Sequence, residues 1–205
     1  MFLQRLEADA DRIVDMPPPM YDKKPVKWVV DLTADGGFLG IVSTAAEGEA
    51  RDRGKQHLVP FVKRAFGIRP ILLADTPAYT FGIDPADTRA AEKHEAYVGL
   101  LRQCVEATES AAVRAVLMFL QGNLDRGLPA DAGRSDLVTF RVGGEFVVDT
   151  PGVRDFWRGT VEPASKLRET TIGQCLVCGE RKPIPLTTPV PVKGIPGGNR
   201  LGPRW

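Results

Sequence analysis

The spacing of hydrophobic residues changes several times along the first part of the chain, and each change predicts a new element. Residues 2–14 carry apolar side chains at helical spacing, and the prolines at 17–19 must end that helix. Residues 26–32 and 38–42 are predicted to pair as a hairpin, because an Asp-Gly-Gly turn lies between them. Residues 43–56 lack an apolar period and are predicted to form a mobile loop.

The middle of the chain predicts two short strands followed by two helices. Prolines interrupt the apolar segment that begins at residue 57, so it favours strands near 71–74 and 79–83 rather than one helix. A long amphipathic helix is predicted from the aspartates at 84 or 87 to about residue 106. A second helix follows Ser110 and ends at a glycine, Gly122.

The last third of the chain predicts a hairpin, a helix and an extended tail. Residues 137–150 alternate around a Gly-Gly turn, and residues 151–161 open with a proline suited to a helix N-terminus. Because hairpins and helices follow one another without a βαβ series, the fold class is predicted to be α+β. We expect an α+β domain over 1–172 and a glycine- and proline-rich, mostly extended segment over 173–205.

Composition narrows the possible functions without selecting one. The chain has 205 residues, 43% of them hydrophobic, with 27 Lys and Arg against 26 Asp and Glu. Attraction to a polyanion must therefore come from local clusters of charge. The amphipathic, acidic start does not resemble a signal peptide, and no window has the roughly 18 apolar residues of a membrane span, so we expect a cytoplasmic protein without a membrane partner.

Cys175 and Cys178 stand two residues apart in a stretch that suits half of a zinc knuckle, a thiol redox pair or a structural turn. Structural zinc needs four ligands, and the remaining candidates, His57, His94 and Cys104, are far away in the sequence. A redox pair would favour a thioredoxin-like βαβ setting, which this stretch lacks. The sequence favours the structural turn and predicts no metal or other cofactor, with the two cysteines as weak candidates for a metal.

Catalytic motifs are absent from the sequence, which has neither a Walker-type loop nor a dinucleotide-binding glycine motif. A lone helical histidine such as His94 is more often structural than catalytic. We therefore predict no catalytic residues, and an enzyme is the weaker functional class.

Basic side chains gather in three places, two of them beside aromatic residues or glycines. Such clusters can follow a phosphate backbone, although a solvated charged face gives the same pattern. Glycine also lets a backbone approach a nucleic acid closely, and asparagine and arginine can contact base edges. The predicted nucleic-acid contacts are Lys63, Arg64 and Arg69, then Lys193, Asn199 and Arg200, with Lys23, Lys24 and Lys27 in reserve.

Four stretches together resemble a known family. Residues 17–42, 59–83, 140–157 and 173–184 are similar, in the same order, to the N-terminal part of the large subunit of the type I-C CRISPR Cascade, an RNA-guided surveillance complex of bacterial antiviral defence. Cys178 occupies a position where that family usually has threonine or serine, which also argues against a metal site.

The resemblance implies a noncatalytic subunit that binds nucleic acid. It implies recognition of a protospacer-adjacent motif in double-stranded target DNA and contacts with the guide RNA handle and the Cas backbone subunits. Cleavage would belong to a recruited helicase-nuclease. A small zinc-knuckle-like nucleic-acid-binding module and, less favoured, a small enzyme are the alternatives.

Overall fold

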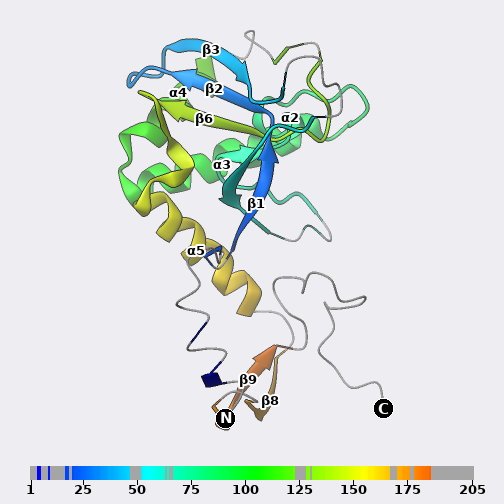
Figure 1. Ribbon diagram of the computed structural model, residues 1–205, viewed down its shortest axis with the longest axis vertical. Coiled ribbons are helices and arrows are strands. Elements are labelled where there is room, and N and C mark those ends of the chain that lie inside the picture. Colours follow the sequence, from blue (N-terminus) through cyan, green and yellow to red (C-terminus); the bar gives the residue numbers. More distant parts are fainter. Residues whose placement is uncertain are drawn as a thin grey trace. The chain divides into compact units, whose positions relative to one another are not determined.

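The computed structural model describes residues 4–5, 9, 17–18, 20–46, 52–62, 64, 67–122, 128–129, 131–166, 170–175 and 178–185. The chain divides into two compact units, one formed by Tyr21–Trp157 and one that joins Met1–Met20 to Arg158–Trp205. The first unit contains the main sheet and its helices, and the second contains a hairpin near the end of the described chain (Figure 1).

The main sheet has five strands: β3, β2, β6 and β5 in that order, and β7, which pairs antiparallel with the other end of β6 from β5. β2 pairs antiparallel with β3 and parallel with β6. Both hairpins predicted from the sequence therefore meet in one mixed sheet. The strands are β2 (Trp28–Leu32), β3 (Phe38–Ser43), β5 (Ala74–Asp75), β6 (Val138–Val142) and β7 (Glu145–Phe146).

Two helices complete the core of this unit. α4 (Ala111–Gly122) packs on β2 and β6, and α3 (Ala90–Thr108) packs on α4. The ring of Phe119 on α4 stacks on Phe38 with the centroids 5.6 Å apart. Phe119 itself is fully buried, as expected for the apolar stripe of an amphipathic helix laid against a sheet.

A separate two-stranded ribbon lies outside the main sheet. β1 (Tyr21–Val26) pairs antiparallel with β4 (Lys55–Pro60). Val26 lies at the end of β1 and Val59 near the end of β4. Both are buried and form a small apolar cluster with Ala74 of the main sheet. This cluster fixes the ribbon to the five-stranded sheet, because a two-stranded hairpin alone is marginally stable in water.

The remaining elements are short except for one helix. They are α2 (Pro77–Thr80), the 3-10 turn η1 (Val147–Asp149), α5 (Pro151–Lys166), β8 (Thr170–Gln174) and β9 (Arg181–Pro185). β8 and β9 pair antiparallel. In the part of the chain that the structure describes, no helix combines the length and the apolar character needed to cross a bilayer.

Most elements predicted from the sequence are confirmed. The first hairpin forms β2 and β3, the two helices are α3 and α4, the second hairpin forms β6 and β7, and the helix after it is α5. The α+β class is confirmed. The predicted helix over 2–14 lies mostly outside the described residues, although Gln4, Arg5 and Asp9 are helical.

Three local predictions were wrong. The strand expected at 79–83 is replaced by α2, because Pro77 occupies a helical first turn and residues 78–80 follow it. The strand expected at 71–74 reaches only Ala74, where the two-residue β5 begins. The loop expected over 43–56 ends in β4, whose first residues are Lys55 and Gln56; residues 47–51 lie outside the described part.

The tail was also predicted to be mostly extended loop, yet β8 and β9 form a hairpin there. Its turn contains Gly179 at a φ of 77°, a left-handed conformation that glycine adopts without strain. Residues 186–205 lie outside the described part of the chain. The boundary expected between 172 and 173 stays a prediction.

Candidate nucleic-acid interface

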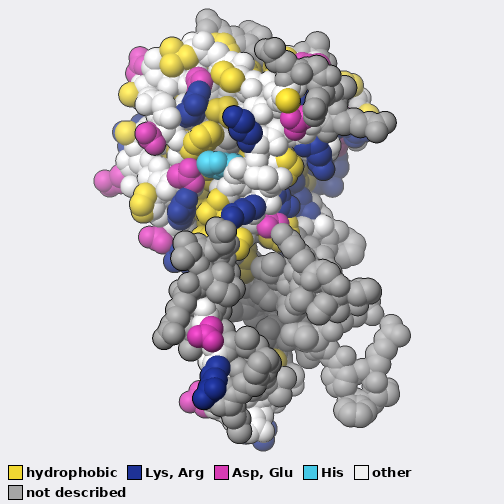
Figure 2. Space-filling model, in the orientation of Figure 1, with side chains coloured by type: hydrophobic (Ala, Val, Ile, Leu, Met, Phe, Trp, Pro, Cys, Tyr) yellow, Lys and Arg dark blue, Asp and Glu magenta, His cyan; other side chains and the backbone are white. Residues whose placement is uncertain are grey.

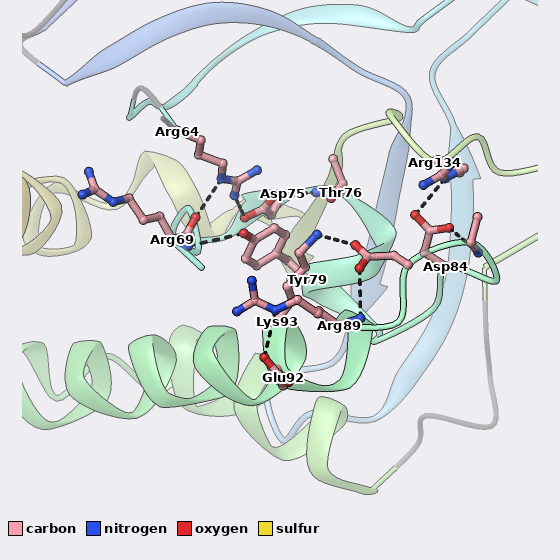
Figure 3. Close-up of polar contacts among 12 residues, drawn as sticks. Arg64, Arg69, Asp75, Thr76, Tyr79, Asp84, Arg89, Glu92, Lys93 and Arg134 are labelled. Atoms are coloured by element: carbon pink, nitrogen blue, oxygen red, sulfur yellow. Dashed lines mark hydrogen bonds and ion pairs between the residues drawn. The ribbon is translucent and has the colours of Figure 1, made fainter. Parts of the chain in front are cut away.

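A cleft of about 640 Å³ lies beside Tyr79 (Figure 3). It is built by four segments that are separate in the sequence: the connection before β5, helix α2, the start of α3 with the residues before it, and the connection before β6. Its charged lining residues are Arg64, Asp84, Asp87, Arg89, Lys93 and Arg134. We call it the Tyr79 cleft.

A buried carboxylate anchors this region. Asp75 at the end of β5 has no exposed surface. It forms an ion pair with the Arg64 guanidinium and accepts hydrogen bonds from the backbone N–H groups of Ile71 and Thr76, at 2.8 and 2.7 Å. Burial raises the pKa of Asp75, while Arg64 and these donors pull the pKa back down. The network fixes the chain on both sides of β5.

Tyr79 forms the floor of the cleft and is held on several sides. Its ring is 4% exposed and lies 4.1 Å from the Arg64 guanidinium and 5.4 Å from the Lys93 ammonium. Its hydroxyl accepts a hydrogen bond from the backbone N–H of Arg69 at 3.3 Å. The Nδ1 atom of His94 lies 3.1 Å from its backbone carbonyl. Two cations therefore already contact the aromatic ring.

Three more ion pairs surround the cleft. The Arg134 Nε atom donates to Asp84 at 2.8 Å, and the Arg89 Nε atom donates to Glu92 at 3.0 Å. Lys93 pairs with Asp87, and the hydrogen bond from Lys93 lowers the pKa of that carboxyl group. Arg134 and Arg89 are more than half exposed, at 65% and 54%, whereas Lys93 is 24% exposed.

The charge of the cleft is nearly balanced, because each of these four cations faces a carboxylate. The pairs are Arg64 with Asp75, Lys93 with Asp87, Arg134 with Asp84, and Arg89 with Glu92. Figure 2 shows the same balance on one face of the molecule, where Lys and Arg side chains are interspersed with acidic and hydrophobic ones. Any anion must therefore bind to individual exposed guanidinium groups rather than to a broad basic field.

The structure separates the basic residues predicted from the sequence. Arg64 lines the cleft, and Arg69 lies next to it with its guanidinium directed away from Tyr79 in Figure 3. Lys27 is in a structural contact, since its side chain is 14% exposed and its Nζ atom lies 3.2 Å from Asp136. Lys23, which is exposed, and Lys24 are on β1. Lys63, Lys193, Asn199 and Arg200 lie outside the described residues.

Sequence reasoning missed Arg89, Lys93 and Arg134. Arg89 and Lys93 are four residues apart at the start of α3, which would place them on one helical face. Arg134 comes from a connection 50 residues beyond its partner Asp84, and no local pattern indicates that pairing.

Cys175 and Cys178 lie in the connection between β8 and β9, where Cys175 is half-buried and Cys178 is exposed. The Cys175 backbone donates to Glu180 and accepts from Gly179, both at 2.8 Å. The hydrogen bond with the Cys178 thiol raises the pKa of Lys182. Across the described residues, no three His, Cys, Asp or Glu side chains come together in a way that could hold a metal ion.

The other three residues weighed for chemistry are occupied by packing contacts. His57 lies 3.1 Å from an Asp149 carboxylate oxygen and its ring is 4.4 Å from that of Phe146, so it joins β4 to η1. Cys104 is buried, and burial raises the pKa of its thiol to about 11. His94 contacts the backbone carbonyl of Tyr79 in α2, and neither it nor Cys104 lines the cleft.

The chain matches a known protein family over nearly its whole length. The model of a family described as CRISPR-associated protein (Cas_Csd1) matches residues 2–202, which include every described element. No curated protein matches the chain.

Proposed function

This chain belongs to the CRISPR-associated Cas_Csd1 family, and from that premise we propose that it is a noncatalytic, nucleic-acid-binding subunit of an RNA-guided surveillance complex. The resemblance seen in its four sequence stretches is thereby confirmed at the level of the family. The type I-C assignment, the cytoplasmic location and the roles described next are part of the proposal.

The proposed roles are to bind duplex target DNA, to recognise the protospacer-adjacent motif and to contact the guide RNA handle and the neighbouring Cas subunits. Pairing with the guide supplies sequence specificity in such a complex, so the protein needs mainly backbone contacts and a few contacts to bases or groove shape. Cleavage is assigned to a recruited helicase-nuclease. A chain with nearly equal numbers of acidic and basic residues and a few local guanidinium groups can make such backbone contacts without a strongly basic surface.

The observation that supports nucleic-acid binding best is the Tyr79 cleft. Arginine is well suited to phosphate, because its planar fork of N–H donors matches two phosphate oxygens at once. Arg64, Arg89 and Arg134 reach this cleft from three separate segments, together with Lys93. Convergence of that kind is more specific than a run of basic residues on one helix.

Reconstitution tests the proposal. We would co-express the chain with the guide RNA and the other Cas subunits, purify the assembly through another subunit, and measure binding of a fluorescein-labelled duplex. We expect the chain to co-purify and the assembly that lacks it to lose tight duplex binding. An assembly that forms without the chain and binds the duplex equally well would refute the proposal.

The glycine-rich tail provides a second test. Changing Lys193 and Arg200 to alanine should weaken duplex binding by the assembly and flatten its dependence on salt, because each lost phosphate contact reduces the salt slope by about 0.9. Arg102 and Arg114 on α3 and α4 are exposed, so their double alanine variant is a charge-matched control. Identical binding curves for both variants at several salt concentrations would contradict this role of the tail.

A further inference from the structure

We propose that Arg134 and Arg89 are the residues of the Tyr79 cleft that contact nucleic-acid phosphates, whereas Arg64 and Lys93 hold the cleft in shape. This inference rests on the proposed function and assigns its ligand chemistry to particular side chains. The ligand is a phosphodiester backbone, in the target DNA or in the guide RNA.

Arg64 and Lys93 are engaged with the protein itself. Arg64 pairs with the fully buried Asp75, donates to the backbone carbonyl of Arg69 at 2.7 Å and lies over the ring of Tyr79. Lys93 pairs with Asp87, and its Nζ atom lies 5.4 Å from the centroid of the same ring. Removing Arg64 would leave a buried carboxylate without its countercharge, so its first role is structural.

Arg134, in contrast, is mostly exposed to solvent and has one carboxylate partner. Its side chain is 65% exposed, while its partner Asp84 is 6% exposed and is fixed by a hydrogen bond from the backbone N–H of Ala86 at 3.1 Å. The contact uses the Arg134 Nε atom. A guanidinium has five N–H donors, so a contact through Nε orients the group and leaves its terminal nitrogens for a ligand. An anchored, exposed fork needs less ordering when it binds phosphate.

Arg89 is the second exposed arginine of the cleft, and Figure 3 shows it beside Tyr79. Its Nε atom donates to Glu92, and both side chains are more than half exposed, at 54% and 61%. Exposed pairs of this kind contribute little to stability, so exchanging them for a phosphate costs little. Because its partner Glu92 is 61% exposed, whereas Asp84 is 6% exposed, we expect Arg89 to be held less firmly and to contribute less than Arg134.

The ligand is a phosphate backbone rather than a stacked base. A base could stack on Tyr79 only if Arg64 and Lys93 left its ring, at 4.1 and 5.4 Å, and Arg64 would then lose its contact with Asp75. Tyr79 is also 4% exposed. The cleft of about 640 Å³ is large enough for a phosphodiester segment. Contacts of this kind position a nucleic acid without reading its sequence.

The test compares Arg134→Ala, Arg89→Ala and Arg134→Lys with the matched control Arg102→Ala, all in the assembled complex. Fluorescein-labelled duplex DNA and a labelled RNA with the guide handle sequence serve as separate ligands, each titrated at several salt concentrations. For the strand that uses the cleft, Arg134→Ala should weaken binding roughly five- to tenfold at low salt, and Arg89→Ala less. The difference should shrink as salt rises, and Arg134→Lys should restore part of the affinity.

Thermal melts check folding. We expect an unchanged melting temperature for Arg89→Ala, because both members of its ion pair are exposed. We expect a small decrease for Arg134→Ala, which leaves the 6% exposed Asp84 without its countercharge, and a smaller decrease for Arg134→Lys, which keeps a cation there. Wild-type affinity of both alanine variants for both strands would refute the assignment. That result leaves the proposed function standing as long as the complex still requires the chain for duplex binding. Loss of that requirement would instead refute the proposed function.

Discussion

Arg141 of β6 donates two hydrogen bonds to the carboxylate of Asp31 on β2, at 2.6 and 2.5 Å. The two residues are directly opposite one another on the parallel pair of strands, although 110 residues separate them in the sequence. Arg141 lies partly over the ring of Phe146, and its contact with Asp31 raises the pKa of its guanidinium. The pair therefore joins the two hairpins of the main sheet.

Changing Asp31 to Asn should lower the free energy of unfolding by roughly 1 kcal/mol, since a two-bond arginine–carboxylate contact is stronger than a single exposed ion pair but is here partly screened by solvent. The side chain of Arg141 is 33% exposed and that of Asp31 is 20% exposed. Urea unfolding at low and high salt measures the effect, which should diminish with salt. Glu106→Gln on the exposed side of α3 is the control. An equal loss in that control would show that Asp31 has no special role.

Changing Arg64 to Ala should destabilise the protein by roughly 3 kcal/mol near neutral pH, because it leaves Asp75 buried without its countercharge. Burial already raises the pKa of Asp75, and losing Arg64 should raise that pKa further. An acid with a raised folded pKa contributes stability below its unfolded pKa of about 4, and that contribution disappears as the pH rises through the folded pKa. The variant should thus be relatively more stable at acid pH.

Urea unfolding of Arg64→Ala across the acid and neutral range measures this dependence. The double variant with Asp75→Asn should lose the additional pH slope, because the titrating group is gone. A pH profile for Arg64→Ala parallel to that of the wild type would show that the carboxyl of Asp75 does not titrate as described.

Changing Gly54 to Ala should cost more than about 2 kcal/mol. Gly54 has a φ of 91°, and a Cβ atom there would lie 2.2 Å from the backbone oxygen of Val26 and 2.7 Å from the Cα atom of Lys27. Both contacts are with backbone, which cannot move away as a side chain can. Gly40 in β3 has no atom within 4 Å of such a Cβ, so Gly40→Ala is the control and should be nearly neutral. Thermal melts of both variants measure the difference in stability. Equal melting temperatures would contradict the predicted clash at Gly54.

Changing Cys178 to Ser should leave folding and metal content unchanged. Cys178 is exposed at the hairpin turn, and its thiol lies 3.7 Å from a Glu180 carboxylate oxygen. We expect elemental analysis of the purified protein to find less than stoichiometric zinc, and a chelator to leave the melting temperature unchanged. Stoichiometric zinc that disappears in Cys178→Ser would support the zinc-knuckle alternative instead.

Local patterns predicted most helices and hairpins correctly because their signals are short-range. The Gly143–Gly144 turn imposes its own geometry, with both glycines at positive φ, and α4 follows directly from its apolar stripe. The strand predicted at 79–83 was wrong because contacts distant in the sequence outweighed its local pattern. Residues 79–83 have strand-like composition, but Pro77 and the supports of Tyr79 place that segment in and after a helical turn.

The candidate site was predictable only in part. Arg64 was selected because it belongs to a local basic cluster, yet its main contacts are with Asp75 and Tyr79. Arg134, which we infer to contact phosphate, is an isolated residue in a connecting segment and faces Asp84 only in the folded chain. A sequence pattern cannot show whether a basic side chain is paired with a buried group of the protein or is exposed and able to contact a ligand.

The sequence by itself determined the local elements, the α+β class and the family, because turn chemistry, hydrophobic period and ordered motifs act over a few residues. Only the tertiary structure decided that β2 and β6 run parallel in one sheet, that Lys27 pairs with Asp136, and that four segments meet at the Tyr79 cleft. Such pairings depend on which surfaces become buried together when the chain closes long loops, and that free energy belongs to the whole fold rather than to any short stretch.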